Sequence, residues 1–310
     1  MARLVGLRLE PVGRADISYI MFFYDRSDGK RVRALRPFDA ILPYVIRKRN
    51  EAAVLFSKDI EVEAALAYAR GKNAEAASLN AQNRERYSLF GILTAAVVRT
   101  MALKPRLNRF VHRRGVYQRS DIAVSFIVKK SFTEVASEGH AKIRFRPEDG
   151  MAEVMEKISA GIETARSGAS GPDDREYGLA HRIPFGKAII TAVFRFLDRF
   201  NIAPPSMVEA DPLFTSVYVA NLGSIGLDTP YHHLYEWGSA SVFMVVGRVF
   251  QKETRHGAGT ELRHYVNVKF TIDERIAEGI YFAHAIALFQ KLIAKPELLE
   301  ASPDLSEVEE

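Results

Sequence analysis

Segments that read as strands and segments that read as helices do not alternate regularly along this chain. Three consecutive strands are predicted in the C-terminal half, at residues 216–221, 239–250 and 265–272, and apolar and polar residues alternate clearly in the last of them. Doubly wound and barrel α/β folds need strand and helix to alternate. The sequence therefore favours an α+β fold, a mixed β-sheet with helices packed on it.

Four segments carry their apolar residues at helical spacing and are predicted to be helices. They are residues 87–103, 151–162, 185–200 and about 278–293. A shorter helix is predicted from Glu61 to Gly71, where the glycine ends it. In residues 38–58 we expect mixed structure, because Pro43 limits any helix there.

The remaining segments complete a single-domain prediction. Residues 1–35 read as a strand or hairpin, and residues 120–130 alternate like a half-buried strand. Residues 166–174 are rich in glycine and serine and are predicted to be a surface loop within the domain. The acidic residues 300–310 are predicted to be a disordered tail. One domain is thus expected over residues 1–299.

Composition excludes several classes of protein. The absence of cysteine excludes disulfides, thiolate metal sites and a cysteine nucleophile. No apolar run approaches the roughly 20 residues that span a bilayer, and the N-terminus lacks the pattern of a signal peptide. We therefore expect a cytoplasmic protein without a transmembrane segment.

The basic charge of the chain, a net +5, is concentrated in two clusters. One is Arg47-Lys48-Arg49, and the other comprises Arg106, Arg109, His112, Arg113 and Arg114. Such clusters are typical of solvated surfaces or of sites for phosphates, including those of coenzyme A. No nucleic-acid partner is predicted, because no helix-turn-helix, zinc-finger or RNA-binding signature accompanies the charge.

Two signatures suggest a family. Residues 273–279 read Asp-Glu-Arg-Ile-Ala-Glu-Gly, and residues 216–226 read Ser-Val-Tyr-Val-Ala-Asn-Leu-Gly-Ser-Ile-Gly. Together they resemble the catalytic domain of the dihydrolipoamide acyltransferases of 2-oxoacid dehydrogenase complexes, and more distantly chloramphenicol acetyltransferase. In that family a strand ends in Asp-His-Arg-x-x-Asp-Gly, and the histidine is the general base. Glu274 stands at the histidine position here, and Glu278 at the position of the second aspartate.

The resemblance covers roughly residues 15–299, since residues 87–108 and 117–124 also resemble the family. It implies the chloramphenicol-acetyltransferase-like two-layer sandwich. It also implies a homotrimer, with further assembly left open, whose active sites lie between subunits. We expect no lipoyl domain, lipoyl group or peripheral-subunit-binding domain before the region of resemblance. We therefore interpret it as a stand-alone, divergent member of the family.

A second departure from the family lies at Ala220. The family has a serine before its Asn-Leu-Gly sequence, and the serine hydroxyl stabilises the oxyanion; Ser224 or Ser216 could substitute for it here. A general base supplies about 10²–10⁴-fold in rate, and one oxyanion donor about 10²–10³-fold. Losing both would remove most of the family chemistry. A glutamate can still act as a base when burial raises its pKa.

The resemblance and the residues together give a set of candidate site residues. The catalytic candidates are Glu274, His233 and His232, and the candidates for substrate binding are Ala220, Asn221, Ser224, Arg275 and Glu278. Neighbouring histidines in a strand point to opposite faces, so we expect no metal site at this pair.

Each of the singled-out residues also has a structural interpretation. Glu274 could pair with Arg275, and Glu278 could complement the dipole of the last helix. The pair His232 and His233 could anchor a loop at a subunit contact.

Two functions follow from these observations. The first is an acyltransferase that passes an acyl group from an acyl thioester, expected to be acyl-coenzyme A, to an acceptor that the sequence does not identify. The second is a catalytically inactive homologue that serves as a trimeric structural or binding subunit. The sequence leaves open whether the chain is an enzyme.

Overall fold

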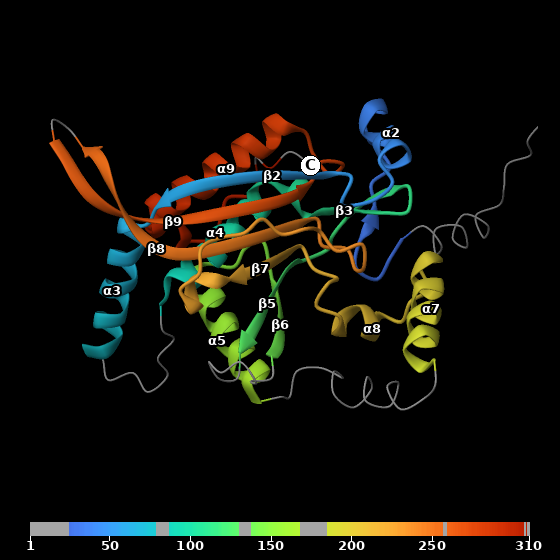
Figure 1. Cartoon of the computed structure of the whole chain (residues 1–310), viewed down its shortest axis with the longest axis horizontal. Coiled ribbons are helices and arrows are strands. Elements are labelled where there is room, and N and C mark those ends of the chain that lie inside the picture. The colour runs from blue at the N-terminus through green and yellow to red at the C-terminus, as the bar shows by residue number, and fades with distance from the viewer. Residues whose placement is uncertain are drawn as a thin grey trace, which may run out of the picture.

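The computed structural model describes residues 25–78, 87–129, 138–167, 185–256, 259–306 and 308. Within them, a mixed sheet has the strand order β2-β9-β8-β7-β5-β6 (Figure 1). Its strands are β2 (Ala53–Glu61), β5 (Ile122–Lys129), β6 (Glu138–Phe145), β7 (Val217–Asn221), β8 (Val242–His256) and β9 (Gly259–Asp273). Strand β7 runs parallel to β5 and β8, and the other neighbouring strands are antiparallel. The predicted α+β class is confirmed.

Helices cover one face of this sheet. They are α3 (Glu63–Ser78), α4 (Leu89–Leu103), α5 (Met151–Ser167) and α9 (Gly279–Ala294). The alternating residues of β9 explain the arrangement, because Val266, Val268, Phe270 and Ile272 all enter the core beneath the helices. The polar residues between them face the opposite side of the sheet.

Helix α4 lies at the centre of the helical layer and is buried on nearly all sides. Ser88 caps its N-terminus by accepting a hydrogen bond from the Gly91 N–H, at 3.1 Å. A buried arginine in such a helix needs hydrogen-bond acceptors. The Arg99 guanidinium donates to three backbone carbonyls at the C-terminal end of the 3-10 helix η3 (Pro296–Leu299). They belong to Leu298, Leu299 and Ala301.

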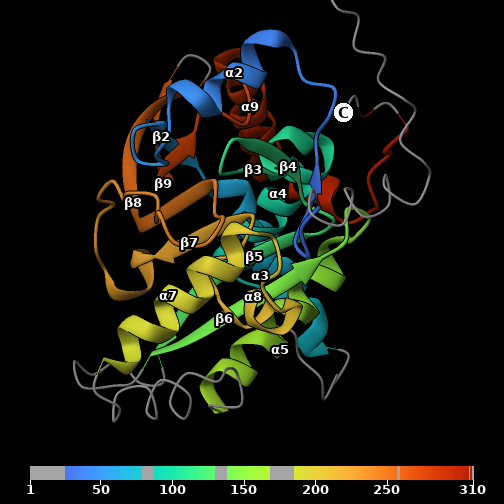
Figure 2. The ribbon, with the colours of Figure 1, turned by 90° about the vertical axis from the view of Figure 1, so that its right-hand side faces the viewer.

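Smaller elements lie towards one end of the molecule, at the right of Figure 1. A second sheet has the order β1-β4-β3, with β1 (Lys30–Arg31), β3 (Arg109–His112) and β4 (Gly115–Gln118). Helices α2 (Pro37–Val45) and α7 (Gly186–Arg199) lie at the right of Figure 1, on the side that faces the reader in Figure 2.

The short helix α8 (Pro205–Ala210) is tied to the edge strand β6 through Lys142. The Lys142 ammonium donates to the backbone carbonyls of Val208, Glu209 and Asp211 at 2.8–3.2 Å. This contact places a cation at the C-terminal end of α8, where the last carbonyls of a helix need donors. Burial lowers the pKa of Lys142 to about 8.

Most predicted elements are present, and the predicted end of one helix is wrong. Gly71 does not end a helix, since α3 continues to Ser78. A glycine inside a helix costs only about 1 kcal/mol relative to alanine. This cost is small enough for α3 to continue through Gly71. Residues 38–58 are mixed, as expected: α2 includes Pro43 and ends two residues later at Val45, and β2 begins at Ala53. The hairpin predicted within residues 1–35 falls mostly outside the described residues, and so does most of the loop 166–174.

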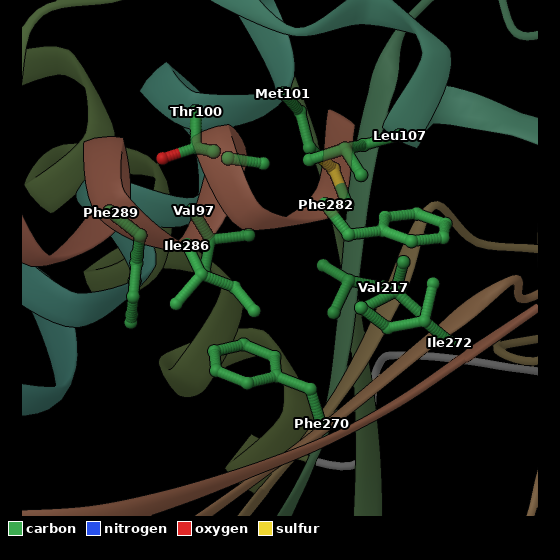
Figure 3. Close-up of a pocket in the computed structure, with 12 residues that line it drawn as sticks. Val97, Thr100, Met101, Leu107, Val217, Phe270, Ile272, Phe282, Ile286 and Phe289 are labelled. Carbon is green, nitrogen blue, oxygen red and sulfur yellow. The ribbon is translucent and has the colours of Figure 1, made fainter. Parts of the chain in front are cut away.

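A small apolar cavity of about 40 Å³ lies between α4, α9 and the sheet (Figure 3). Its lining includes Val97, Phe270 and Phe282, and the hydroxyl of Thr100 is already used to donate to the Ala96 carbonyl at 2.6 Å. A cavity without a spare polar group stays dry. We therefore interpret it as a packing gap in the core rather than as a binding site for a polar substrate.

The contacts of Arg99 give a first prediction. Arg99→Met keeps the bulk of the side chain but leaves buried carbonyls without donors, so we expect it to lower the free energy of unfolding by about 3 kcal/mol. Urea denaturation followed by circular dichroism measures this loss. Arg70→Met, at an exposed position of α3, is the matched control and should change stability little. Equal effects of the two substitutions would contradict the assigned role of Arg99.

Candidate functional site

The turn that joins β9 to α9 is fixed by a buried ion pair. The Arg275 guanidinium binds the Asp273 carboxylate through two bonds, from Nε to Oδ1 at 2.8 Å and from Nη2 to Oδ2 at 2.7 Å. Its Nη1 also donates to the carbonyls of Ile46 at 3.0 Å and Arg47 at 3.3 Å. Both charged side chains are buried. Arg275 therefore ties the turn to the segment that follows α2.

Glu274, between these two residues, points the other way and is exposed. Its backbone N–H donates to the Ala52 carbonyl at 2.9 Å, at the start of β2. One interpretation of Glu274 was an ion pair with Arg275. This pair does not form, because the Arg275 guanidinium binds Asp273 instead. The exposed Glu274 carboxylate is thus presented at the surface by a rigid turn.

Glu278 is the N-cap residue of α9, yet its side chain accepts no capping hydrogen bond. It pairs instead with the guanidinium of Arg36 and lies 3.8 Å from that of Arg106. Arg36 also binds Asp39 in the first turn of α2. The negative charge does lie where the dipole of α9 favours it. Its main partners are nevertheless the two arginines, which connect α2 and η1 (Pro105–Asn108) to the turn.

The candidates from the second signature lie at the end of β7. Ala220 and Asn221 are partly buried, and the exposed Ser224 hydroxyl donates to the Asn221 carbonyl at 2.8 Å within the 3-10 helix η2 (Leu222–Ile225). Gly223 permits the close packing of this turn. A Cβ atom there would lie 2.3 Å from the Gly247 carbonyl oxygen. The second signature thus builds a tight turn against β8.

The strand register separates these residues from Glu274. Asn221 is paired with Val246, and Val246 is paired with Val268 of β9. Val268 precedes Asp273 by five residues, which is about 16 Å along a strand. One chain therefore does not bring the two groups of candidate residues together. They can form a common site only where a second chain approaches.

His232 and His233 lie in the loop between η2 and β8, on the face of the sheet opposite the helices. The His232 ring stacks on Phe243 with 3.9 Å between ring centroids, and the His233 ring lies 4.7 Å from the His232 ring. The Thr271 hydroxyl donates to the His232 carbonyl and so holds the loop close to the end of β9. Burial lowers the pKa of His232, which keeps the imidazole neutral at pH 7.

A basic pocket of about 200 Å³ lies beside the buried ion pair. Arg275 lines it, and both basic clusters of the sequence contribute to it. Its other charged or titratable residues are Arg47, Arg49, His112, Arg113, Arg195, Asp198 and Glu236. The remaining arginines of the second cluster have other contacts, such as that of Arg106 with Glu278. The convergence of the two clusters was not predictable, because residues 47–49, 112–113 and 195–198 are far apart in the sequence.

Arg49, like Arg275, is a buried cation of this pocket. Its guanidinium donates to the carbonyls of Tyr235, Gly238 and Val111 at 2.6–3.3 Å. Its Nε has no hydrogen-bond partner within the described part of the chain and lies 4.0 Å from the Asp273 carboxylate. Burial lowers the pKa of Arg49, and Arg275 nearby lowers it further. A buried donor without an acceptor, among several guanidinium groups, is suited to binding an anion.

His112 adds a neutral donor or acceptor to the pocket. Burial, together with the charge of Arg26, lowers the pKa of His112 to about 3. The imidazole is therefore neutral, and its 3.6 Å contact with Asp198 is not an ion pair. Asp198 pairs with Arg26 instead, at 2.8 Å. The Nε2 atom of His112 is buried without a hydrogen-bond partner among the described residues.

No group of three or more histidine, aspartate or glutamate side chains is placed to hold a metal ion, as far as the described residues show. The titratable side chains that line the basic pocket are arginines, the carboxylates of Asp198 and Glu236, and the neutral imidazole of His112.

Solved structures with the same fold include acetyltransferases. A probable dihydrolipoamide acetyltransferase from Listeria monocytogenes superposes with a TM-score of 0.56 and 12% identity, over 86% of this chain and 95% of that chain. The dihydrolipoamide acetyltransferase of Azotobacter vinelandii gives a TM-score of 0.56 and 12% identity, over 94% of this chain and 99% of that one. A chloramphenicol acetyltransferase gives 0.50 and 13%, over 86% and 96%.

At these identities the likeness shows the fold. No model of a protein family matches the sequence. No curated protein sequence matches it either.

Arg113 has a backbone conformation that suggests a prediction. It opens the two-residue turn between β3 and β4 with φ of 56°, a left-handed conformation that favours glycine. Arg113→Gly should raise the free energy of unfolding by about 1 kcal/mol, while weakening the binding of inorganic phosphate to the pocket. Arg114→Gly, at the next position, is the control and should not stabilise. A destabilised Arg113→Gly protein would show that the arginine contacts outweigh the strain.

The lowered pKa of His112 predicts a pH dependence of stability. The unfolded chain takes up a proton at an ordinary pKa near 6.5, whereas the folded chain resists protonation down to about pH 3. The contribution of His112 is therefore complete above pH 6.5 and is lost as the pH falls towards 3, by an amount of a few kcal/mol. His112→Asn should flatten this part of the profile in urea titrations at several pH values. His284→Asn, at an exposed position of α9, should leave the slope unchanged.

Proposed function

We propose that this protein is an acyltransferase that passes an acyl group from acyl-coenzyme A to a nucleophilic acceptor, at a site completed between the subunits of a homotrimer. The observation that carries the proposal is the basic pocket beside the buried Asp273–Arg275 pair, on a fold shared with acetyltransferases. Its arginines would hold one anionic group of the donor. A cytoplasmic location is part of this proposal.

Acyl transfer from the thioester to the acceptor takes three steps. A base takes the proton of the acceptor, the acceptor attacks the thioester carbonyl, and the coenzyme A thiolate leaves and is protonated. The study of the Azotobacter vinelandii enzyme names a serine, a histidine and an asparagine in its mechanism, the last two four positions apart. Glu274 and Glu278 have the same spacing here. That spacing supports Glu274 as the group facing the acceptor and Glu278 as its neighbour in the site.

His232 and His233 are the alternative bases. A neutral imidazole can accept a proton at pH 7, and burial keeps His232 neutral. Its Nδ1 lies 2.8 Å from the His233 carbonyl, so Nδ1 carries the hydrogen and Nε2 is the atom that could accept a proton. In this proposal Ala220, Asn221 and Ser224 contribute from a second chain, because the register separates the end of β7 from the end of β9 by about 16 Å along the strands.

A second candidate function rests on a different observation. Asp273 and Arg275 bind each other, and Glu278 binds two arginines, so three of the four charged groups in the turn hold the fold together. Such contacts need no turnover. The corresponding proposal is a catalytically inactive homologue that acts as a trimeric structural or binding subunit.

Substitution of Glu274 separates the two functions. Because Glu274 is exposed, Glu274→Gln should change the free energy of unfolding by no more than about 1 kcal/mol. For the acyltransferase we expect this change to abolish acyl transfer from acetyl-coenzyme A, measured as release of free thiol. Glu253→Gln, at an exposed position of β8, is the control. Unchanged turnover in Glu274→Gln would remove Glu274 from the catalytic candidates and leave the histidines.

The double variant Glu274→His and Ala220→Ser tests whether the pocket still accepts substrate. Base and oxyanion donor act as one unit, so the double variant should gain more activity than the two single variants together. Light scattering gives the mass of the same samples. A monomer would exclude a site between subunits. A trimer that neither transfers the acyl group nor is stabilised by acyl-coenzyme A would favour the structural subunit.

A further inference from the structure

The basic pocket carries more positive charge than its own carboxylates neutralise. Five arginines line it: Arg47, Arg49, Arg113, Arg195 and Arg275. Asp273 binds Arg275, and Glu236 lies near enough to Arg49 to offset its charge. The other three arginines are exposed, and none of them has a carboxylate partner within the described part of the chain. We call these three, Arg47, Arg113 and Arg195, the mouth arginines.

The two carboxylates that line the pocket already have partners. Glu236 accepts hydrogen bonds from the backbone N–H groups of Arg49 at 3.2 Å and Asn50 at 3.0 Å. Asp198 binds Arg26 at 2.8 Å. The charges of the mouth arginines therefore remain uncompensated. Because the attraction between charges scales with their product, such a mouth attracts a dianion more strongly than a monoanion.

Arg195 is held at the mouth without using its N–H groups. Its guanidinium lies over the Trp237 ring, 5.7 Å from the ring centroid. The Trp237 ring is itself fixed, since its N–H donates to Asp211 at 2.5 Å and its face stacks on Phe194. Stacking on an aromatic ring uses the face of a guanidinium and leaves the N–H groups at its edge. Arg195 is thus positioned in advance to donate to an anion.

Arg113 occupies its place at the mouth in spite of its backbone. Its φ of 56° lies in the left-handed region, which favours glycine. A residue kept in such a conformation is typical of functional sites. One nitrogen of its guanidinium, Nη1, donates to the Arg199 carbonyl at 3.2 Å. This bond directs Arg113 towards α7 and leaves further N–H groups for a ligand.

The inner end of the pocket contains polar atoms without partners. The Nε of Arg49 and the Nε2 of His112 are buried, and neither has a hydrogen-bond partner among the described residues. The Arg49 side chain is only 7% exposed. Leaving a buried donor without an acceptor is costly. An oxyanion in the pocket would supply the acceptor that Arg49 lacks.

We propose that the basic pocket binds a phosphate group as its dianion, either free phosphate or the terminal monoester of a larger ligand. Guanidinium groups match the oxygens of phosphate. The donors come from residues 47–49, from the turn at 112–113 and from α7. A tetrahedral group has oxygens that face all of these directions, whereas a planar carboxylate has only two oxygens.

The size of the pocket limits what enters it. Its volume of about 200 Å³ is below the roughly 300–1,000 Å³ of pockets that enclose whole small molecules. The pocket therefore takes the phosphate group and leaves the rest of a larger ligand outside. Arg275 lines the pocket, whereas the neighbouring Glu274 points the other way. The bound phosphate is thus separate from the reacting groups.

One source of the phosphate rests on the proposed function. Coenzyme A carries a 3′-phosphate, which is a monoester and a dianion at neutral pH. Each phosphate of its diphosphate bridge carries a single negative charge. If coenzyme A is the donor, its 3′-phosphate is the group that the pocket selects.

Calorimetric titration with inorganic phosphate tests the site itself. The unchanged protein should show one saturable site. Arg47→Gln together with Arg195→Gln should weaken binding at least about tenfold, because it removes charge-assisted hydrogen bonds. Both positions are exposed, so thermal melts without phosphate should show no loss of stability. Arg70→Gln together with Arg146→Gln removes the same charge at exposed positions outside the pocket and should leave the affinity unchanged.

Two results would overturn the proposal. One is the absence of saturable phosphate binding to the unchanged protein. The other is an equal loss of affinity in the two double variants, since binding would then follow the overall charge and not the pocket.

Acetyl-coenzyme A and its analogue without the 3′-phosphate distinguish the two sources. If the donor supplies the phosphate, inorganic phosphate should compete with acetyl-coenzyme A. The analogue should then bind about tenfold more weakly to the unchanged protein, and the Arg47→Gln and Arg195→Gln variant should not distinguish the two compounds. Phosphate that binds without competing assigns the pocket to free phosphate. Phosphate binding without acyl transfer contradicts the proposed function alone, and acyl transfer without phosphate binding contradicts this proposal alone.

Discussion

The buried ion pair between Asp273 and Arg275 is the contact on which the site depends. Taking two charges out of water is costly, and it is tolerated only where the pair has good geometry and further hydrogen bonds. Arg275 meets both conditions, with two bonds to the carboxylate and two to backbone carbonyls of residues 46 and 47. Removing either partner would leave a buried charge unmatched. The end of β9, the segment after α2 and the start of α9 are therefore positioned together.

Arg49 extends this arrangement into a larger buried network. It donates to carbonyls on the loop before β8 and on β3, which otherwise share no strand pairing. Nearby, Asp28 accepts from the Ser239 hydroxyl at 3.1 Å, and Arg119 donates to the same serine. The small sheet is thus attached to the large one through arginines as well as through Val111 and Val116, which enter the shared apolar core. A pocket lined by these groups is basic as a direct consequence.

The spacing of apolar residues predicted much of this fold, because β9 and α9 each bury only one face. An element buried on one face places its apolar residues at regular intervals in the sequence. Strand β2 was missed, since Lys58 and Asp59 break the apolar pattern on an edge strand whose residues are mostly outside the core. Helix α7 shows a different limit. Its stripe predicted a helix correctly, but a stripe does not reveal whether the protein's own core covers it. The basic pocket was beyond prediction, because only the fold brings residues 47–49 and 112–113 to the same place.

The alternation at the end of β9 explains how the side chain at position 274 can change while the fold persists. Asp273 and Arg275 point inward and hold the turn, whereas Glu274 between them points outward and contributes only its backbone N–H to β2. The stability of the turn is therefore nearly independent of the side chain at position 274. The resemblance to the family at Asp273 and Arg275 therefore indicates a shared fold, because these two residues hold the turn. It does not indicate what Glu274 does chemically. Function at that position is decided by what a neighbouring chain or a ligand presents to the exposed carboxylate.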